Sequence, residues 1–387
     1  MKKWFLNHPA NFFLIAAIFA ISVLWFLDIF DNNFSWHDIL VEAHGMFYDL
    51  LVFGILLALY EQFKNKTDSI KRYKEELDDY RGWTEGEAAY RVAGIIRRLK
   101  NEDVQNIDFS NLHLGKLETS LIVELIKKEV SIVSLENSIL KETNLQEANL
   151  WEANLQNADL RGADLQEANL GGSNLQKANL YGSNLQKADL GRAKLNGAEL
   201  ENANLDGAYL EGANLEGVNL TGANLQNIES EEASFQEANL IDSKLQNANL
   251  MGANLQGATL HEANLQGANL MSADLQEAYL QDTILLEALL VDANLHNANL
   301  RSANLEEAEL ALAGLKGACL IKANFKNANL TNANLENAQV DSTNWFDILK
   351  KQNVRGLELL ESKYYVGATP QENSYGDIYF TIKAIKD

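Results

Sequence analysis

The chain has 387 residues, a formal net charge of −22 and a single cysteine, Cys319. A chain this acidic is not expected to bind nucleic acid directly, because phosphate groups are bound by Lys and Arg. The lone cysteine excludes an internal disulfide, and the length allows two or three domains.

Residues 1–63 are predicted to form a helical hairpin in a lipid bilayer, with spans at about 10–30 and 43–63. The first segment is an almost unbroken apolar run that is long enough, with its flanks, to cross the bilayer core. A cleaved signal peptide is the alternative there, but no small-residue cleavage site follows the run. The second segment contains Asp49, so a helix that lies in the membrane interface is its alternative.

The charges around the two segments predict their orientation. Lys2 and Lys3 precede the first, five Lys or Arg residues lie within 64–74, and residues 31–42 carry three acidic residues and no basic one. Because basic flanks stay in the cytoplasm, both termini and the rest of the chain are expected there, with residues 31–42 outside. The predicted location is the bacterial inner membrane, as a multi-pass protein.

Residues 64–130 are predicted to hold a stalk helix and an N-terminal cap with degenerate repeats. From about 65 to 81 the apolar residues follow a coiled-coil spacing, although for less than three heptads. Self-association through this stalk, or through the C-terminal end of the chain, is a possible route to a homo-oligomer.

Residues 131–345 repeat with a period of five and without an insertion, which makes 43 units. The central residue is Leu in 38 units and the residue two before it is Ala in 33, while the other three positions are polar and varied. A period of five fits neither an amphipathic helix nor a strand. Strict repetition instead indicates a solenoid, in which each unit buries its apolar face against its neighbours.

Units such as Ala148-Asn149-Leu150 and Ala158-Asp159-Leu160 resemble the pentapeptide repeat family, whose pattern is A(D/N)LXX. The resemblance implies an all-β solenoid, a right-handed quadrilateral β-helix in which four units make one square coil. The inward Leu and Ala would then fill the interior, and Asn before Leu would form ladders along the rod.

Glycines gather two places after the central residue, where a turn can require a positive φ. They are Gly162, Gly172, Gly182, Gly212, Gly222 and Gly252. Ser230 is the only polar central residue, and Ile228 lies beside it at a position that is otherwise small. We interpret this pair as an exchange of large and small side chains within one corner. Both ends of the solenoid are predicted to carry helical caps. A helix through Lys350 is expected after Trp345-Phe346, and residues 346–387 are rich enough in apolar residues to form the C-terminal cap.

No motif for an active site occurs in the chain, and the outward His261 and His296 have no evident partner set. We therefore predict a non-enzymatic protein without cofactor or metal. A cluster of outward apolar residues is the candidate surface for an unknown protein partner, and the alternative is that the C-terminal tail covers it. These residues are Met251, Met271, Tyr279, Ile284, Leu286, Leu289 and Val291.

Asp242, Glu262 and Asp282 recur at every fourth unit and should stack as an acidic stripe. Like charges on adjacent strands repel each other, so the stripe either is simply solvated or binds a basic partner segment or a divalent cation.

The function predicted from these features is a membrane-tethered scaffold or adaptor that presents the acidic rod for protein–protein interaction. The family resemblance implies two alternatives. Some soluble members imitate DNA and bind DNA gyrase, a topoisomerase, and some membrane-anchored members are linked to lipid or glycolipid export. A fold by itself does not distinguish these functions.

Overall fold

The computed structural model describes residues 22, 37–81, 91–92, 94–96, 98–99, 102, 134–374 and 376–385, with only the backbone over 37–50. The chain divides into two compact units, one of Met1–Asp79 with Asn101–Asp103 and one of Tyr80–Lys100 with Val104–Asp387. The predicted first span (10–30) and most of the predicted N-terminal cap lie outside the described residues.

The first unit contains α3, a single helix over His37–Asp78. The sequence predicted two elements here, an apolar segment at 43–63 and a separate stalk helix, and the structure joins them because no proline or turn sequence separates them. No helix among the described residues is both long and apolar enough to cross a membrane. The predicted second segment, 43–63, is part of α3.

α3 nevertheless exposes large apolar side chains over about three turns. They are Val52, Phe53, Ile55, Leu56, Leu59, Tyr60 and Phe63, between 43% and 71% exposed. The helix continues past them into a strongly charged segment that contains Lys64, Lys66 and Lys71.

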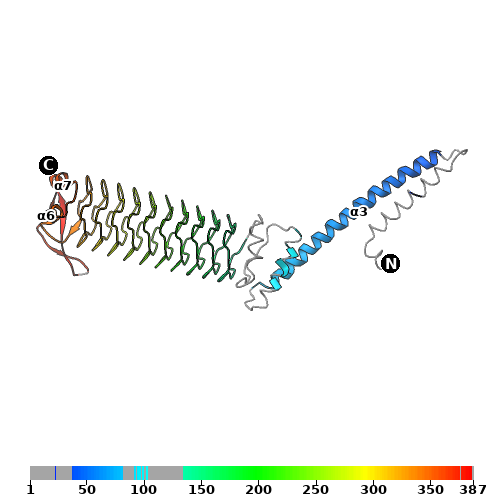
Figure 1. Cartoon of the computed structure of the whole chain (residues 1–387), viewed down its shortest axis with the longest axis horizontal. Helices are drawn as coiled ribbons and strands as arrows, with labels where there is room; N and C mark the ends of the chain where they lie inside the picture. Colours follow the sequence, from blue (N-terminus) through cyan, green and yellow to red (C-terminus); the bar gives the residue numbers. More distant parts are fainter. Residues whose placement is uncertain are drawn as a thin grey trace. The chain divides into compact units, whose positions relative to one another are not determined.

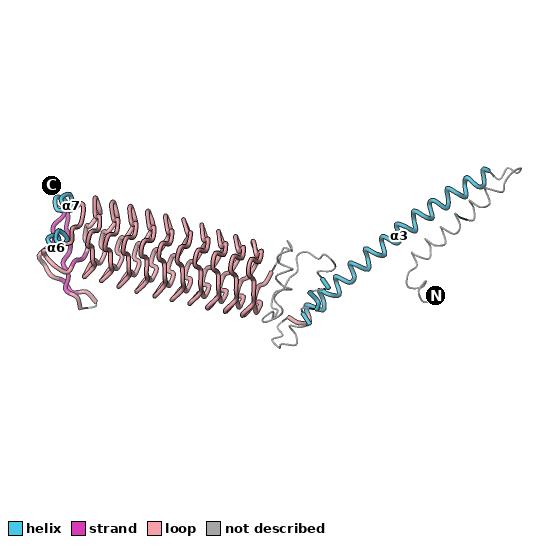
Figure 2. Tube along the Cα trace, in the orientation of Figure 1, coloured by secondary structure: helices cyan, strands magenta, loops and turns pink. Residues whose placement is uncertain are grey.

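The second unit contains the solenoid, in which the described five-residue units share one local structure as far as residue 340. Two inward residues flank one bridging residue, and a two-residue turn leads to the next unit. Bridging residues pair in parallel with the equivalent residue four units later, as in Asn154 with Asn174 and Asp159 with Asn179. Four units therefore make one coil, as predicted, and the coils stack along one axis (Figures 1 and 2).

The interior is filled by the residues that the repeat predicts. Central Leu residues and the Ala residues two before them are almost all 0–1% exposed over the whole solenoid. The backbone seals this core, because the N–H of Leu145 donates to the carbonyl of Asp164 at 2.6 Å and the N–H of Asp164 donates to that of Thr143 at 2.8 Å. Close packing of one large and one small side chain leaves no room for water.

The turns have the positive φ that the glycines predicted, with values from 61° to 66° at the six named positions. Polar residues with side chains adopt the same conformation at the equivalent place, for example Glu167 at 56° and Lys177 at 55°. Glycine is therefore not required there. The left-handed conformation costs about 1–2 kcal/mol per residue, and the hydrogen bonds of each turn offset it.

The bridging Asn residues have two roles, of which the sequence predicted one. Their side chains form the expected ladders, since Asn174 donates to Asn154 at 3.3 Å and Asn324 donates to Asn304 at 2.9 Å. In addition, the side-chain oxygen of Asn154 accepts the N–H of Gln156 at 3.2 Å, which closes the turn that follows. This second bond explains why Asn or Asp precedes most turns.

The C-terminal end contains two helices, α6 (Trp345–Lys351) and α7 (Leu357–Lys363), and four short strands. The strands are β1 (Gln339–Val340), β2 (Tyr364–Val366), β3 (Gln371–Glu372) and β4 (Ile378–Ala384). β4 pairs antiparallel with β1, β2 and β3, so a strand near the end of the chain covers the last strand of the solenoid. The sequence analysis predicted neither this sheet nor α7.

Buried rings close the end of the core. The ring of Trp345 meets that of Phe325 edge-on, with centroids 5.9 Å apart, and Trp345 is 3% exposed. Arg355 pairs in parallel with Asn329. It takes the place that a residue of the next coil would have in a longer solenoid. Backbone groups that would remain unpaired at an open β-helix end are thus bonded on two faces.

Candidate interaction surface

The bridging residues form four columns, one on each face of the solenoid, and the predicted apolar cluster spreads over three of them. Tyr279 pairs with Thr259 and Asn299, and Ile284 and Leu289 lie in the two columns that follow. The residues named as one candidate patch therefore lie on three faces of the solenoid. Each five-residue step turns the chain to the next face, so residues that are close in sequence point in different directions.

A smaller group does gather at one corner. Met251, Met271 and Val291 are successive residues of one turn ladder, and Leu289 lies in the column beside it. Ile284 lies in the column on the other side of Leu289's face, and Leu286 lies at the turn between these two columns. Met251, Ile284 and Leu289 are each 38% exposed, and Tyr279 is 50% exposed on its separate face.

The sequence analysis missed Leu312, which is 56% exposed and belongs to the same corner as Met271. Its φ is +64°, in the left-handed region that an aliphatic residue rarely adopts. The signal was available, because Leu312 is the only apolar residue at the second turn position between 134 and 345.

The described part of the C-terminal tail does not cover this group. Its side-chain contacts reach only the last coils: Asp377 binds Arg301 at 2.7 Å and Lys322 at 2.9 Å, and the Tyr364 hydroxyl donates to Asn334 at 3.2 Å. Arg355 also pairs with Glu309. These contacts lie beyond Met251, Met271 and Leu289, which stay partly exposed with the described tail in place.

The three residues of the acidic stripe, Asp242, Glu262 and Asp282, are exposed along one corner at φ values of 56° to 58°. The sequence analysis found no partner for His261, and here it was wrong. The imidazole Nε2 lies 3.3 Å from Glu262, and Nδ1 lies 3.9 Å from Asp282 and 3.1 Å from the carbonyl oxygen of Gln281. A protonated His261 would offset part of the repulsion within the stripe.

Ion pairs shift the pKa of groups at the C-terminal end. Hydrogen bonds from Arg301 and Lys322 lower the pKa of Asp377 from 3.8 to about 2. Burial raises the pKa of the nearby Cys319 thiol, so this thiol is a weak nucleophile at neutral pH. The described residues hold no group of three His, Cys, Asp or Glu side chains placed to bind a metal ion.

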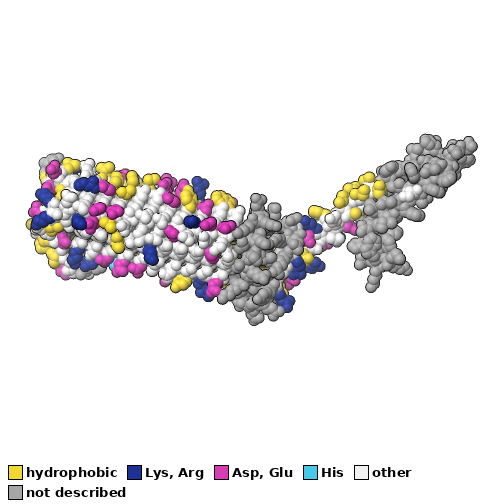
Figure 3. Space-filling model, in the orientation of Figure 1, with side chains coloured by type: hydrophobic (Ala, Val, Ile, Leu, Met, Phe, Trp, Pro, Cys, Tyr) yellow, Lys and Arg dark blue, Asp and Glu magenta, His cyan; other side chains and the backbone are white. Residues whose placement is uncertain are grey.

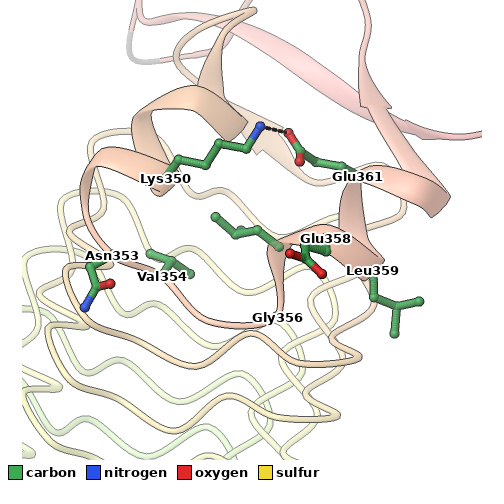
Figure 4. Close-up of a pocket in the computed structure, with 8 residues that line it drawn as sticks. Lys350, Asn353, Val354, Gly356, Glu358, Leu359 and Glu361 are labelled. Atoms are coloured by element: carbon green, nitrogen blue, oxygen red, sulfur yellow. Dashed lines mark ion pairs between the residues drawn. The ribbon is translucent and has the colours of Figure 1, made fainter.

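A hollow of about 520 Å³ lies beside α6 and α7 at the C-terminal end (Figure 4). Val354 and Leu357 line it, and an ion pair of 2.6 Å between Lys350 and Glu361 joins the two helices. Its charged lining residues are Lys350, Glu358 and Glu361, and it contains no His, Cys or Ser.

The repeat geometry matches a known sequence family. The model of pentapeptide repeats matches residues 133–166, 163–202, 198–229, 233–271, 273–310 and 308–344, which is more than half of the chain. The chain belongs to the pentapeptide repeat family. Its solenoid is accordingly a right-handed β-helix.

Several solved structures of pentapeptide repeat proteins are similar to the chain. HetL of the cyanobacterium Nostoc sp. strain PCC 7120, a protein involved in heterocyst differentiation regulation, is 34% identical over 63% of this chain and 95% of its own, with a TM-score of 0.32. QnrB1, a plasmid-mediated fluoroquinolone resistance protein, is 14% identical over 57% and 96%, with a TM-score of 0.30. Rfr23 of the cyanobacterium Cyanothece 51142 is 29% identical over 35% and 90%, with a TM-score of 0.21. A search of curated proteins found no match.

Proposed function

We propose that this pentapeptide repeat protein is a non-enzymatic scaffold that binds a protein partner on the surface of its solenoid. The observation that carries the proposal is the group of exposed apolar side chains around Met251, Leu289 and Leu312, which the described tail leaves uncovered. Exposed apolar groups on an otherwise polar surface commonly mark protein interfaces. In Figure 3 hydrophobic and acidic side chains lie interspersed on the visible face of the solenoid.

The shape of the solenoid supports a binding role over a catalytic one. Its interior is filled by Leu and Ala, and its variable residues all point outward from a convex surface. Catalytic groups usually need a concave, water-poor site that perturbs their pKa values. The strongly shifted carboxyl, Asp377, is held between two cations that tie the tail to the solenoid.

The test is site-specific photocrosslinking in intact cells with a photoreactive residue at Leu289 or Leu312. Both positions are expected to capture the same partner. Gln256, at a turn on another corner of the solenoid, is the matched control and should capture little. Equal capture at all three positions, or none at Leu289 and Leu312, would contradict a specific interface there.

We also propose that the N-terminal region tethers the protein to a bacterial inner membrane, with the solenoid on the cytoplasmic side and residues 31–42 outside. The exposed apolar side chains of α3, from Val52 to Phe63, support attachment because water would solvate them poorly. The basic residues within 64–74 support the cytoplasmic side, since they favour contact with anionic lipid headgroups.

Two measurements test attachment and sidedness. The full-length chain should float with vesicles of phosphatidylglycerol and phosphatidylethanolamine, and its recovery with the soluble fraction would contradict attachment. A cysteine placed at Ser35 should react with a membrane-impermeant thiol reagent in intact cells. A cysteine placed at the exposed Lys177 in the solenoid is the control and should stay unlabelled. The reverse labelling would overturn the orientation.

A further inference from the structure

One corner of the solenoid differs in composition from the others. We call it the 151–331 edge, the ladder of first turn residues that recur at every fourth unit. Its members are Trp151, Gly171, Gly191, Glu211, Glu231, Met251, Met271, Val291, Ala311 and Thr331. It contains no Lys, Arg, His, Asn or Gln, whereas the equivalent ladder from Gln146 to Lys326 contains six Gln residues. The repeat geometry is the same at both corners, so it does not dictate this difference.

The first part of the edge is aromatic. The Trp151 ring lies over Gly171, because a Cβ at that position would collide with the ring atom Cζ3. The Tyr209 ring lies over Gly191 in the same way, at 3.3 Å. Between the rings is a hollow of about 210 Å³, and the rings stay 54% and 43% exposed. The two glycines thus let the rings lie along the rod toward each other.

The middle of the edge is acidic, and hydrogen bonds hold its carboxylates in place. The side-chain amide of Asn249 donates to Glu229 at 2.8 Å and to Glu231 at 2.9 Å. The hydroxyl of Tyr209 contacts the carboxylate of Glu211. Three carboxylates therefore face solvent within about two coils, and Arg192, beside the aromatic hollow, is the basic residue that lines this region.

The last part of the edge is aliphatic. Met251, Met271 and Val291 follow one another along the ladder, with Leu289 and Leu312 at its sides. The described tail does not cover them. The edge is thus apolar at both ends and negative in the middle.

We propose that the 151–331 edge binds an amphipathic α-helix of the partner, with apolar residues at both ends of its contact face and Lys or Arg in the middle. This inference rests on the proposed scaffold function and specifies the chemistry of the partner. The complementary charge would pair with Glu211, Glu229 and Glu231, and the apolar ends would bury the rings and the aliphatic group.

The dimensions of the edge favour a helix. Coils stack about 4.8 Å apart, which is close to the helical pitch of about 5.4 Å, so successive turns of a helix meet successive coils. Trp151 and Ala311 are eight coils apart, which corresponds to about 38 Å or about 26 helical residues.

The backbone of the edge argues against binding of an extended strand. A strand would need unpaired N–H and C=O groups along the solenoid. Here the N–H of Asn249 donates to Ile228 at 2.9 Å, and its carbonyl accepts from Ser230 at 2.9 Å. The carbonyl of the turn residue Met251 likewise accepts from Glu232 at 3.1 Å. Recognition must therefore use side chains.

The test measures binding of two labelled helical peptides of about 26 residues to the full-length protein by fluorescence anisotropy. Both have the same composition. One carries Leu at the ends of its apolar face and Lys in the middle, and the other has the two exchanged. The first is expected to bind about tenfold more tightly, and more weakly as NaCl rises from about 0.05 to about 0.5 M.

A matched pair of variants locates the site. Glu211→Gln with Glu231→Gln should weaken the first peptide about tenfold, because both carboxylates lie on the edge. Glu201→Gln with Glu216→Gln removes the same charge from two other corners and should leave binding unchanged. All four side chains lie at turn positions on the surface, so circular dichroism should show intact solenoids.

Equal affinity for the two peptides, or an equal loss in both variant pairs, would overturn the inference. Those outcomes differ from failure of the scaffold function. If Leu289 and Leu312 still capture one partner in cells, the interface stands and only its assignment to a helix with a basic middle is wrong.

Discussion

The solenoid and its C-terminal end show two ways of closing a hydrophobic core. In the solenoid each unit contacts the next unit in sequence and the equivalent unit of the adjacent coil, and one pattern of Leu, Ala and Asn is enough to specify it. At the end, β4 returns from Ile378–Ala384 to pair with Gln339–Val340, and Trp345 packs on Phe325. Repetition specifies the first region, whereas the second depends on a few unique contacts. The end should therefore be more sensitive to single substitutions.

Replacement of Trp345 by Ala tests this difference most strongly. Loss of the buried ring should destabilise the cap and the adjacent coils by about 3–5 kcal/mol. Hydrogen exchange should report faster opening near residues 305–340 than near 205–240, because stability in a solenoid is transmitted between neighbours. Leu359→Ala is the control, since this side chain is 41% exposed, and it should have little effect. Uniform protection along the rod would argue against a cap that is energetically distinct.

The substitution Ser230→Leu tests how much the one irregular corner of the solenoid contributes to the stability of the protein. Ser230 and Ile228 are both fully buried, and the Ser230 hydroxyl donates to the carbonyl of Asn249 at 2.8 Å. A Leu should overpack the corner and destabilise the protein by about 1–3 kcal/mol in urea denaturation. Ser230→Ala, which removes only the hydrogen bond, should cost about 1 kcal/mol. A stabilising Ser230→Leu would indicate a void in place of an exchange of volumes.

Lowering the pH should destabilise the C-terminal end of the protein before it destabilises the middle of the solenoid. The folded pKa of Asp377 is about 2, below its ordinary value of 3.8. Its pairing with Arg301 and Lys322 is therefore fully stabilising above about pH 4 and is lost as the pH falls toward 2. Amide exchange in β4 should rise over that interval, while the Leu amides of the middle coils stay protected. Asp377→Asn should abolish the pH dependence in β4, and its persistence in this variant would assign it to another group.

The smallest expected difference lies between two serines at the small inward position. The Ser243 hydroxyl donates to the carbonyl of Leu240 at 2.7 Å, whereas the buried Ser183 hydroxyl has no hydrogen-bond partner within the described residues. Ser243→Ala should destabilise the protein by about 1 kcal/mol, and Ser183→Ala should be neutral or slightly stabilising. Thermal denaturation of the two variants compares them directly. Equal destabilisation would mean that Ser183 is also bonded in solution.

Most of the solenoid could be predicted from the sequence, because its interactions repeat with the same period as its residues. Inward Leu and Ala, Asn ladders, positive-φ turns and the stacked Asp242, Glu262 and Asp282 all follow from that period. The ladder of Met251, Met271 and Val291 also follows from the period, whereas Tyr279 and Ile284, which are close to it in sequence, lie on other faces. In a coil of four faces, equivalent residues four units apart are neighbours, and those in consecutive units point in different directions.

The sequence by itself determined the five-residue repeat and the identity of the core residues, and its resemblance to the family implied the four-unit coil. Only the tertiary structure decided that His261 faces two carboxylates, that Leu312 joins Met251 and Met271 at one corner, and that β4 closes the end. The physical reason is the range of the interactions. Short-range contacts leave a periodic signal in the chain, whereas contacts between unique residues on different coils become visible only when the coils are stacked.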